Sequence, residues 1–310
     1  MTPKIVCVAG PTACGKTTLG VLLAQRFHGE VVSADSMQIY RGMTVGTAAP
    51  TEAEMQGVPH HMIAVAEPSE QWSAAEYVTK ATPIVDDILS RGKLPILVGG
   101  TGLWMDSLIR GHGFAGGHAG GEVRRELETR FDRDGIEPLL AELRQVDPEA
   151  AAAIHPNNQV RVLRALEHYR ATGKKLSEQK AESLPPEKPY RSLILGLDFP
   201  DRATLYRRID LRVDKMLKAG ILPEAELVWQ NRETYRTAAQ AIGYKEFFPY
   251  FEGAASLEAC TDKLKQVSRN YAKRQLTWFR HMDGVVWLDA GAPDVRQTAI
   301  RTVSEFLAKG

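Results

Sequence analysis

The stretch Gly10–Thr17 reads GPTACGKT and fits the pattern G-x-x-x-x-G-K-[ST]. It stands between a short apolar run, Ile5–Ala9 (IVCVA), and a helical pattern over Thr17–Phe27. A strand, a glycine-containing loop and a helix in this order form an anion-binding loop, because backbone N–H groups and the helix N-terminus attract phosphate. Lys16 adds a point charge, and the Thr17 hydroxyl is placed to bind Mg²⁺. The loop predicts binding of a di- or triphosphate, without indicating which one.

Further apolar runs follow in alternation with helical patterns. Val31–Ala34 and Leu94–Val98 are typical of buried strands, and the pattern of Ala74–Arg91 between them is helical. Ser192–Leu197 and Val285–Asp289 indicate two more strands, with long charged helices between them. This alternation predicts an α/β fold, a P-loop NTPase-like core with a parallel sheet flanked by helices.

The middle of the chain has a different character. Gly111–Gly121 (GHGFAGGHAGG) holds six glycines in eleven residues, which predicts a mobile linker. Over Glu122–Arg170 the pattern is helical, with breaks at Gly135 and at Asp147-Pro148 and no strand, and the proline-rich segment at 184–189 closes this block. We expect a catalytic core made of 1–112 and 191–310, interrupted by an all-helical insertion domain over 113–190.

The composition fits an ordinary globular protein. Of the 310 residues, 44% are hydrophobic and 25% charged, and the net charge of +1 excludes a strongly basic nucleic-acid coat but not a local basic face. The three cysteines show no CxxC spacing, so neither a disulfide scaffold nor a zinc ribbon is expected. Ile5–Gly10, the longest early apolar stretch, is too short for a membrane span or a signal-peptide core. We expect a cytoplasmic protein with no membrane association.

The features that accompany the loop in other P-loop proteins are missing. There is no Asn-Lys-x-Asp motif to read guanine, and the apolar run Leu94–Val98 ends in Gly99-Gly100-Thr101 without a carboxylate. The aspartate at a strand end is instead Asp35, after VVSA. Because ligands collect at the carboxyl ends of parallel strands, Asp35, Thr101 and the loop should meet in one cleft. Asp35 could hold Mg²⁺ through water, act as a general base, or simply form a turn or helix cap.

A basic segment lies near the end of the chain. Lys263–Arg280 contains six Lys or Arg, no acidic residue, and interleaved aromatic residues. On a helix, Arg269, Lys273 and Arg280 fall on one side, a face that can follow RNA phosphates. The alternative is a solvated surface with Trp278 in the core.

Three smaller features have plain structural interpretations. His60-His61 lack a third ligand at a workable spacing, so we expect a structural use over a metal site. Cys14 is expected to be a small filler of the loop, with a reactive thiol as the alternative. The basic residues of 202–218 alternate with aspartates, which predicts surface ion pairs.

Taken in order, the motifs of this chain resemble those of the tRNA dimethylallyltransferases. The matching blocks are GPTACGKT at 10–17, SADSMQIY at 33–40 with RGM at 41–43, GTA at 46–48, PHH at 59–61, VGGTG at 98–102, HPN at 155–157 with Arg161 and RALE at 164–167, RIDLRVDKM at 208–216, AIGY at 241–244 and KRQLTWFR at 273–280. Three departures stand out: the glycine-rich linker replaces a proline-containing segment, Cys14 replaces Ser or Thr, and Trp104 replaces Tyr.

The resemblance implies an activity and its participants. It implies transfer of the dimethylallyl group from dimethylallyl diphosphate to N6 of the adenosine at position 37 of tRNA, beside the anticodon, with Mg²⁺ as cofactor. The P-loop would then bind an allylic diphosphate in place of ATP. The partners would be the tRNA anticodon stem-loop, recognised partly by the insertion domain, and the small diphosphate; we expect a monomer.

The resemblance also implies roles for individual residues. Asp35 would be the general base, Thr101 would lie beside the reacting groups, and Arg212 would reach the pyrophosphate. The diphosphate-binding residues would be Gly10, Pro11, Thr12, Ala13, Cys14, Gly15, Lys16 and Thr17, with Thr17 on the metal. The tRNA-binding residues would be Asp35, Ser36, Met37, Gln38, Arg124, Gln159, Val160, Arg161, Val162, Leu163, Ala241, Ile242, Gly243, Tyr244, Lys273, Arg274 and Arg280.

Three other functions stay open at this point. A P-loop nucleotide or nucleoside kinase also carries an inserted lid, and arginines of the insertion such as Arg124 and Arg164 could serve it. A non-catalytic RNA-binding switch gated by nucleotide is disfavoured by the missing guanine reader. Prenylation of free adenine nucleotides would leave the helical insertion without a use.

Overall fold

The computed structural model describes residues 2–113, 121–178, 185 and 187–309. The chain divides into two compact units: Met1–Arg110 together with Lys188–Gly310, and Gly111–Glu187. Positions 114–120 of the predicted linker, and 184 and 186 of the proline-rich segment, lie outside the described residues.

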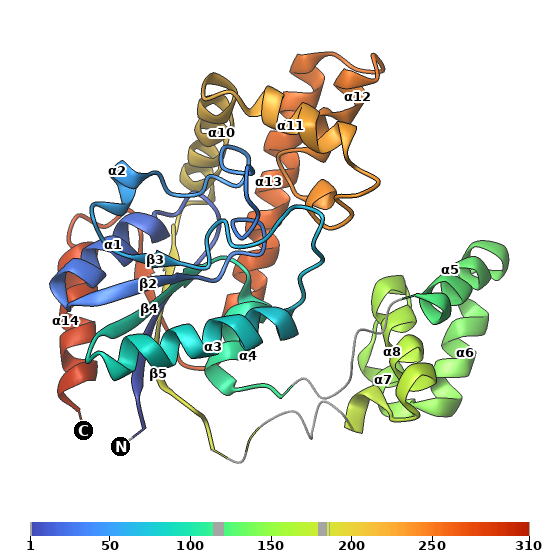
Figure 1. The fold of residues 1–310 in the computed structure, drawn as a ribbon, viewed down its shortest axis with the longest axis horizontal. Helices are drawn as coiled ribbons and strands as arrows, with labels where there is room; N and C mark the ends of the chain where they lie inside the picture. The colour runs from blue at the N-terminus through green and yellow to red at the C-terminus, as the bar shows by residue number, and fades with distance from the viewer. Residues whose placement is uncertain (1, 114–120, 179–184, 186, 310) are drawn as a thin grey trace. The chain divides into compact units, whose positions relative to one another are not determined.

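The first unit is built on a six-stranded parallel sheet with the strand order β3-β2-β4-β1-β5-β6 (Figure 1). The strands are β1 (Lys4–Ala9), β2 (Gly29–Ser33), β3 (His60–His61), β4 (Leu94–Gly99), β5 (Arg191–Asp198) and β6 (Val285–Asp289). The predicted α/β class is therefore confirmed, and five strands were predicted near these positions. The edge strand β3 was not predicted, because two residues are too few to show a strand periodicity.

Strand β1 lies inside the sheet, and both of its faces are buried. Ile5 and Cys7 belong to one hydrophobic core, whereas Val6 and Val8 belong to another on the opposite face. Since side chains alternate across a strand, burial on both faces requires an apolar residue at every position, which explains the run IVCVA. The phosphate-loop sequence thus begins at the end of a rigid, fully packed strand.

Helices cover the two faces of the sheet (Figure 1). The helices of the first unit are α1 (Lys16–Arg26), α2 (Glu52–Met55), α3 (Ala74–Ser90), α4 (Gly102–Arg110), α10 (Arg202–Lys218), α11 (Ile221–Gln230), α12 (Phe248–Phe251), α13 (Leu257–Arg280) and α14 (Val295–Ala308). Helix α3 begins at a capping box between Ser73 and Glu76. Helix α14 was not predicted from the sequence; its Ala299 and Val303 are buried, and Val295, Ile300, Phe306 and Leu307 pack against the same core.

The second unit has its own small core and no strand among its described residues. Its helices are α5 (Glu122–Asp134), α6 (Glu137–Val146), α7 (Pro148–Ala153) and α8 (Gln159–Thr172), packed around residues such as Leu127, Leu143 and Leu166. The predicted breaks are real: α5 ends at Gly135, and Asp147 caps α7 by accepting the Ala150 N–H at 3.0 Å.

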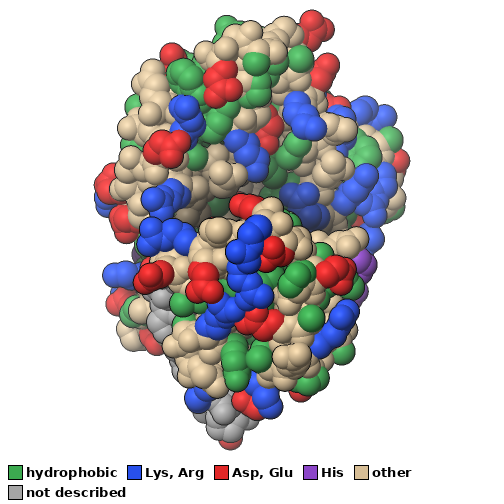
Figure 2. Space-filling model, turned by 90° about the vertical axis from the view of Figure 1, so that its right-hand side faces the viewer, with side chains coloured by type: hydrophobic (Ala, Val, Ile, Leu, Met, Phe, Trp, Pro, Cys, Tyr) green, Lys and Arg blue, Asp and Glu red, His purple; other side chains and the backbone are tan. Residues whose placement is uncertain are grey.

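No helix in the described part of the chain is both long and apolar enough to cross a membrane. Charges of both signs are interspersed on the face shown in Figure 2, so positive charge does not form one continuous surface there. This agrees with the nearly balanced composition.

Candidate active site

The phosphate loop joins β1 to α1 through an unusual backbone path. Gly10 has φ 146° and Gly15 has φ 95°, values that favour glycine, and Ala13 also lies in the left-handed region at φ 64°. A Cβ at Gly10 would lie 2.5 Å from the carbonyl oxygen of Leu197, so a side chain there would also collide with β5. Gly15 is the N-cap of α1, whose first amides have no intrahelical acceptor. The loop is an anion-binding cradle at a helix N-terminus.

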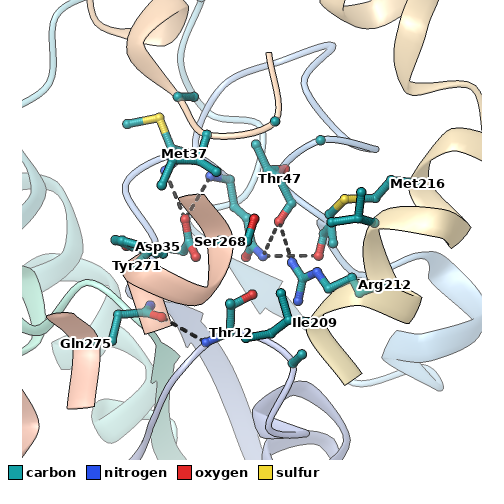
Figure 3. A pocket seen from close by; sticks show the side chains of 18 of the residues that line it. Thr12, Asp35, Met37, Thr47, Ile209, Arg212, Met216, Ser268, Tyr271 and Gln275 are labelled. Atoms are coloured by element: carbon teal, nitrogen blue, oxygen red, sulfur yellow. Dashed lines mark hydrogen bonds between the residues drawn. The ribbon is translucent and has the colours of Figure 1, made fainter. Parts of the chain in front are cut away.

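The cradle opens into a cavity of about 660 Å³ within the first unit. Lys16 and Thr17 line it from α1. Asp35 lines it from the segment after β2, and Arg212 from α10 (Figure 3). The predicted convergence of Asp35 with the phosphate loop is therefore observed. Thr101, which was predicted to join them, is not among the described residues that line the cavity and instead contacts Ser36, the neighbour of Asp35. Apolar side chains of α10 and α13, including Val213, share the same cavity.

The two inner cations of the cavity are partly desolvated. The ammonium of Lys16 donates to the carbonyl of Pro11 at 2.7 Å. Burial lowers the pKa of Lys16; the charge of Arg212 acts in the same direction, whereas Cys14 and Asp35 oppose it. Burial likewise lowers the pKa of Arg212, against the opposing charge of Asp35. Positive charge concentrated in a partly dry cleft favours a polyanionic ligand.

A second arginine of α10, Arg208, contacts the phosphate loop. No role was predicted for it from the sequence. Arg208 Nε donates to the Ala13 carbonyl at 2.9 Å, and Arg212 Nη2 donates to the Thr47 carbonyl at 3.3 Å. The spacing of four residues places both on one helix face and could have indicated Arg208. Of the predicted ion pairs between basic residues of 202–218 and the alternating aspartates, Arg207 with Asp201 is present. Asp210 and Asp214 pair instead with Arg269 and Lys265 of α13.

The Asp35 side chain both forms a turn and lines the cavity. Its Oδ1 accepts the backbone N–H groups of Met37 at 3.0 Å and Gln38 at 3.4 Å, so the carboxylate does form a turn. The same side chain lines the cavity beside Thr12 and Gln38. The turn fixes the carboxylate in place and does not remove it from the site.

Thr101 connects the segment after β4 to the segment after β2. Its Oγ1 accepts the Ser36 N–H at 3.0 Å and lies 3.3 Å from the Ser36 hydroxyl. Its side chain also contacts the hydroxyl of Tyr271 in α13. Burial, together with the nearby charge of Asp35, raises the pKa of Tyr271 to about 12, so this phenol stays neutral at physiological pH. Tyr271 is a member of the cavity that the sequence analysis did not assign.

The glycines of Gly99-Gly100-Thr101-Gly102 make room for side chains of α13. A Cβ at Gly100 would lie 2.1 Å from Gln275 Nε2, and one at Gly102 would lie 2.0 Å from Trp278 Cδ1. Gln275 is buried, whereas Trp278 is 38% exposed, which contradicts the alternative in which Trp278 lies in the core. The absence of side chains at Gly100 and Gly102 lets α13 approach the end of β4.

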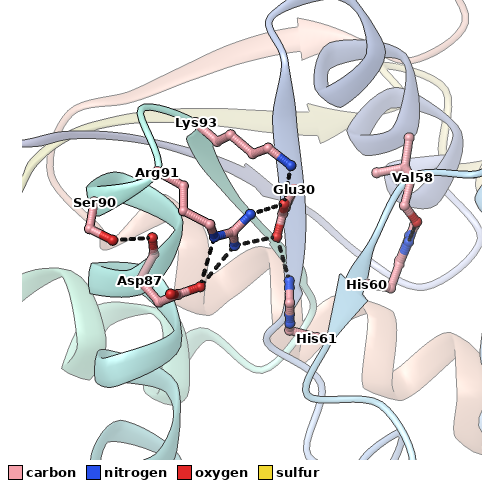
Figure 4. Close-up of polar contacts among 8 residues, drawn as sticks. All are labelled: Glu30, Val58, His60, His61, Asp87, Ser90, Arg91 and Lys93. Atoms are coloured by element: carbon pink, nitrogen blue, oxygen red, sulfur yellow. Dashed lines mark hydrogen bonds and ion pairs between the residues drawn. The ribbon is translucent and has the colours of Figure 1, made fainter.

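The adjacent histidines have structural partners. His60 Nδ1 contacts the Val58 carbonyl at 2.8 Å, and His61 Nε2 lies 2.8 Å from buried Glu30 (Figure 4). Glu30 also accepts from Arg91 and Lys93. The preference for a structural use of this pair is confirmed.

The donor set of the cavity fits a magnesium ion shared with a phosphate ligand. The described residues contain no cluster of three His, Cys, Asp or Glu that could hold a metal by itself. Thr17 offers a hydroxyl in the cavity, and Asp35 offers one carboxylate. Mg²⁺ commonly keeps several waters and uses few protein ligands together with substrate phosphates, so such a sparse set is suitable.

Several residues assigned to tRNA have buried side chains. Val162 and Leu163 are 0% and 1% exposed in the core of the second unit, and Tyr244 is 0% exposed in the first. Ala241 is buried as well, at 3%. These side chains pack the protein interior, whereas neighbours such as Val160 are exposed; the assignment of these segments to tRNA stays a prediction.

The predicted basic face lies on α13, but part of its charge is neutralised within the protein. Arg269 pairs with Asp210 at 2.6 Å, and Arg280 pairs with Asp198 at 2.9 Å. Lys273 is exposed, with its ammonium 5.8 Å from the ring of Tyr206. On α5, Arg124 pairs with Glu128 at 2.7 Å.

Comparison with known proteins identifies the family. A family model described as IPP transferase matches residues 38–282, and one described as Isopentenyl transferase matches residues 3–70. The chain belongs to the IPP transferase family. The match to this family covers Thr101, Arg212 and Gln275, and the shorter match covers the phosphate loop and Asp35.

Individual relatives extend over almost the whole chain. A tRNA dimethylallyltransferase of Halalkalibacterium halodurans is 46% identical over 99% of this chain and 98% of its own, and one of Bacillus subtilis is 45% identical over 93% and 91%. The crystal structure of a tRNA isopentenylpyrophosphate transferase from Bacillus halodurans has a TM-score of 0.71 at 43% identity, covering 99% and 96% of the two chains. A eukaryotic dimethylallyltransferase acting on tRNA has a TM-score of 0.83 at 31% identity, covering 99% and 80%.

Proposed function

We propose that this protein transfers the dimethylallyl group from dimethylallyl diphosphate to N6 of the adenosine at position 37 of tRNA and releases diphosphate. The observation that carries the proposal is one cavity in which the phosphate loop, Arg212 and Asp35 meet. Relatives of nearly the same length carry the name tRNA dimethylallyltransferase, which supports the same acceptor and donor.

The chemistry places its main demand on the leaving group. Adenine N6 is a weak nucleophile because its lone pair is delocalised into the ring, whereas an allylic carbon tolerates positive charge. Stabilising the departing diphosphate is therefore the dominant task, and fixed donors can perform it without reorganising. In this chain the donors are the amides of 13–17, Lys16 and Arg212.

Thr17 is the residue that we propose to hold Mg²⁺, which supplies further positive charge to the diphosphate when bound. Arg208 acts on the protein side, since its guanidinium holds the Ala13 carbonyl and keeps the cradle in shape. Lys16 also stabilises the loop, because its ammonium donates a hydrogen bond to the Pro11 carbonyl.

Asp35 is the proposed general base for the N6 proton. Two backbone amides hold its Oδ1, so the carboxylate is fixed before substrate binds. General-base catalysis of this kind contributes roughly 10²- to 10⁴-fold in rate. Tyr271 lines the same cavity as a neutral phenol that can orient the adenine, and Thr101 holds Ser36, the residue next to Asp35.

The tRNA is proposed to lie along exposed parts of both units, at Lys273 and Arg274 on α13 and at Gln159 and Arg161 at the start of α8. The anticodon-loop adenosine would leave its stack to reach the cavity, as loop bases in RNA readily do. We further propose that the protein acts as a monomer in the cytoplasm; its three cysteines are unpaired and buried, which suits a reducing compartment.

The test uses the purified protein with Mg²⁺, dimethylallyl diphosphate and an unmodified tRNA transcript, followed by mass spectrometry of the digested RNA. We expect a five-carbon gain on the adenosine at position 37, and none in a transcript that carries guanosine there. A gain on free adenosine monophosphate, with tRNA unmodified, would contradict the proposed acceptor.

A further inference from the structure

Glu224, in α11, binds the backbone of a loop that precedes α2. Its Oε2 accepts the N–H groups of Thr44 at 2.9 Å and Val45 at 3.1 Å, and its Oε1 accepts that of Gly46 at 2.9 Å. The hydroxyl of buried Tyr244 donates to the same Oε1 at 2.6 Å. The Glu224 carboxylate therefore accepts hydrogen bonds from three consecutive backbone amides and one phenol.

The carbonyls that follow in this loop hold two side chains of the cavity. The Thr47 carbonyl accepts Arg212 Nη2 at 3.3 Å and Gln38 Nε2 at 3.4 Å, and the Ala48 carbonyl accepts Gln38 Nε2 at 3.2 Å (Figure 3). The loop is the connection between Glu224 and the guanidinium of Arg212.

Packing allows this loop little freedom. A Cβ at Gly46 would lie 2.5 Å from Tyr244 Cζ, so the phenol ring lies directly against the glycine. On the same side, a Cβ at Gly243 would approach the Gly46 carbonyl to 3.1 Å. The Tyr244 ring therefore limits how closely the loop can approach, and the Glu224 carboxylate holds the orientation of the loop's amides.

We propose that Glu224 is a positioning residue of the diphosphate site. It acts through the 44–48 loop, whose Thr47 carbonyl keeps Arg212 directed into the cavity, and it does not itself line the cavity in the described part of the chain. This inference rests on the proposed role of Arg212 at the diphosphate.

The chemistry of the side chain explains why a carboxylate is needed. Three amide N–H groups and one phenol O–H converge on Glu224, and a carboxylate is the side chain that accepts at both oxygens. A glutamine would place an NH₂ group against at least one of these donors. Glu224→Gln therefore keeps the size of the side chain while breaking the arrangement.

The test is a double-mutant cycle on dimethylallyl transfer to tRNA. We expect Glu224→Gln to lower kcat/KM for dimethylallyl diphosphate on the order of 10- to 100-fold, as misplacement of a binding group by about 1 Å does. The dissociation constant for tRNA should stay within about twofold. In an Arg212→Ala background the same change should cost less than about twofold, and Glu226→Gln, an exposed position on the same helix, is the control.

Two results would overturn the proposal. One is a wild-type kcat/KM in Glu224→Gln. The other is a double variant whose fold-loss in kcat/KM equals the product of the fold-losses of Glu224→Gln and Arg212→Ala. If Glu224→Gln does not fold, Tyr244→Phe takes its place in the cycle, because it removes one donor to the carboxylate and keeps the ring on Gly46. A smaller loss that disappears in the Arg212→Ala background is then expected, and no loss or full multiplication overturns the proposal.

Calorimetric binding of inorganic pyrophosphate separates this inference from the proposed function. We expect Glu224→Gln to weaken pyrophosphate binding roughly tenfold, whereas unchanged binding would contradict the positioning role. A wild-type protein that binds pyrophosphate but transfers no prenyl group to tRNA would refute the proposed function alone.

Discussion

The side-chain oxygen of Gln275 accepts the backbone N–H of Thr12 at 2.8 Å, so α13 reaches into the phosphate loop. Its Nε2 donates to the Gly100 carbonyl at 3.0 Å. A single buried amide thus joins the loop after β1 to the segment after β4, and it does so from the helix that also carries Lys273.

Replacing Gln275 should loosen the phosphate loop. In Gln275→Leu the Thr12 N–H and the Gly100 carbonyl lose their partner in a buried setting, which typically costs about 1–3 kcal/mol of unfolding free energy. We expect KM for dimethylallyl diphosphate to rise as well. Urea unfolding and steady-state kinetics measure both effects, with exposed Gln266→Leu on the same helix as the control. Equal KM in the two variants would argue against the connection.

Asp35→Asn separates the two uses of this side chain. Asparagine keeps an oxygen for the Met37 and Gln38 amides, so the turn and the melting temperature should be preserved. It cannot act as the base, and we expect turnover to fall about 10²- to 10⁴-fold with tRNA affinity retained. Single-turnover kinetics give the rate, and turnover close to that of the wild type would rule out Asp35 as the base.

Lys273 should contribute to tRNA binding through charge alone. Its ammonium is exposed, so we expect Lys273→Ala to weaken binding uniformly among tRNAs and to reduce the slope of log K against log salt by about 1. Arg301→Ala, an exposed cation on α14, is the matched control. Filter binding over a salt series measures the slope, and identical slopes for both variants would refute this role.

Glu30 should make stability depend on pH. Hydrogen bonds from Arg91, supported by Lys93 and His61, hold the pKa of Glu30 well below its ordinary value despite burial. Because the folded pKa is the lower one, this contribution is complete above the unfolded pKa of about 4.3 and is lost as pH falls through the folded pKa. Unfolding free energy should therefore decline below about pH 4.

Glu30→Gln tests this linkage. Since Arg91 and Lys93 are partly solvated, we expect a loss near the lower end of the range for breaking a buried pair, about 3 kcal/mol at pH 7. The decline toward acid pH should be shallower than in the wild type. Denaturant unfolding at several pH values measures both, and exposed Glu67→Gln should change little. An unchanged pH profile in Glu30→Gln would contradict the assignment.

The phosphate loop and Asp35 could be predicted because their signal is local. GPTACGKT stands directly between a strand and a helix, and Asp35 directly follows a strand, so neighbouring residues suffice to place them. Gln275 and Glu224 could not be predicted, because they act on backbone atoms 263 and 178–180 residues away. Nothing in their own surroundings distinguishes them from surface residues of amphipathic helices.

The motifs assigned to tRNA did not indicate which of their side chains are exposed. Val162 and Tyr244 lie in motifs that resemble a tRNA-binding family, yet a motif does not reveal which of its side chains face inward. Helical spacing placed Arg269 and Arg280 on α13, but their carboxylate partners come from α10 and β5, which the periodicity of one helix cannot indicate. The residues with free access to RNA can be separated only once the elements are packed.

The most direct measurement determines which compound, dimethylallyl diphosphate or ATP, donates the group that is transferred. The protein is given Mg²⁺, unmodified tRNA, dimethylallyl diphosphate and ATP labelled at its terminal phosphoryl group, and both labelled phosphate and prenylated adenosine are quantified. We predict a prenyl group on tRNA with one diphosphate released per transfer and no label on any product. Labelled phosphoryl on an acceptor, with dimethylallyl diphosphate left intact, would contradict it.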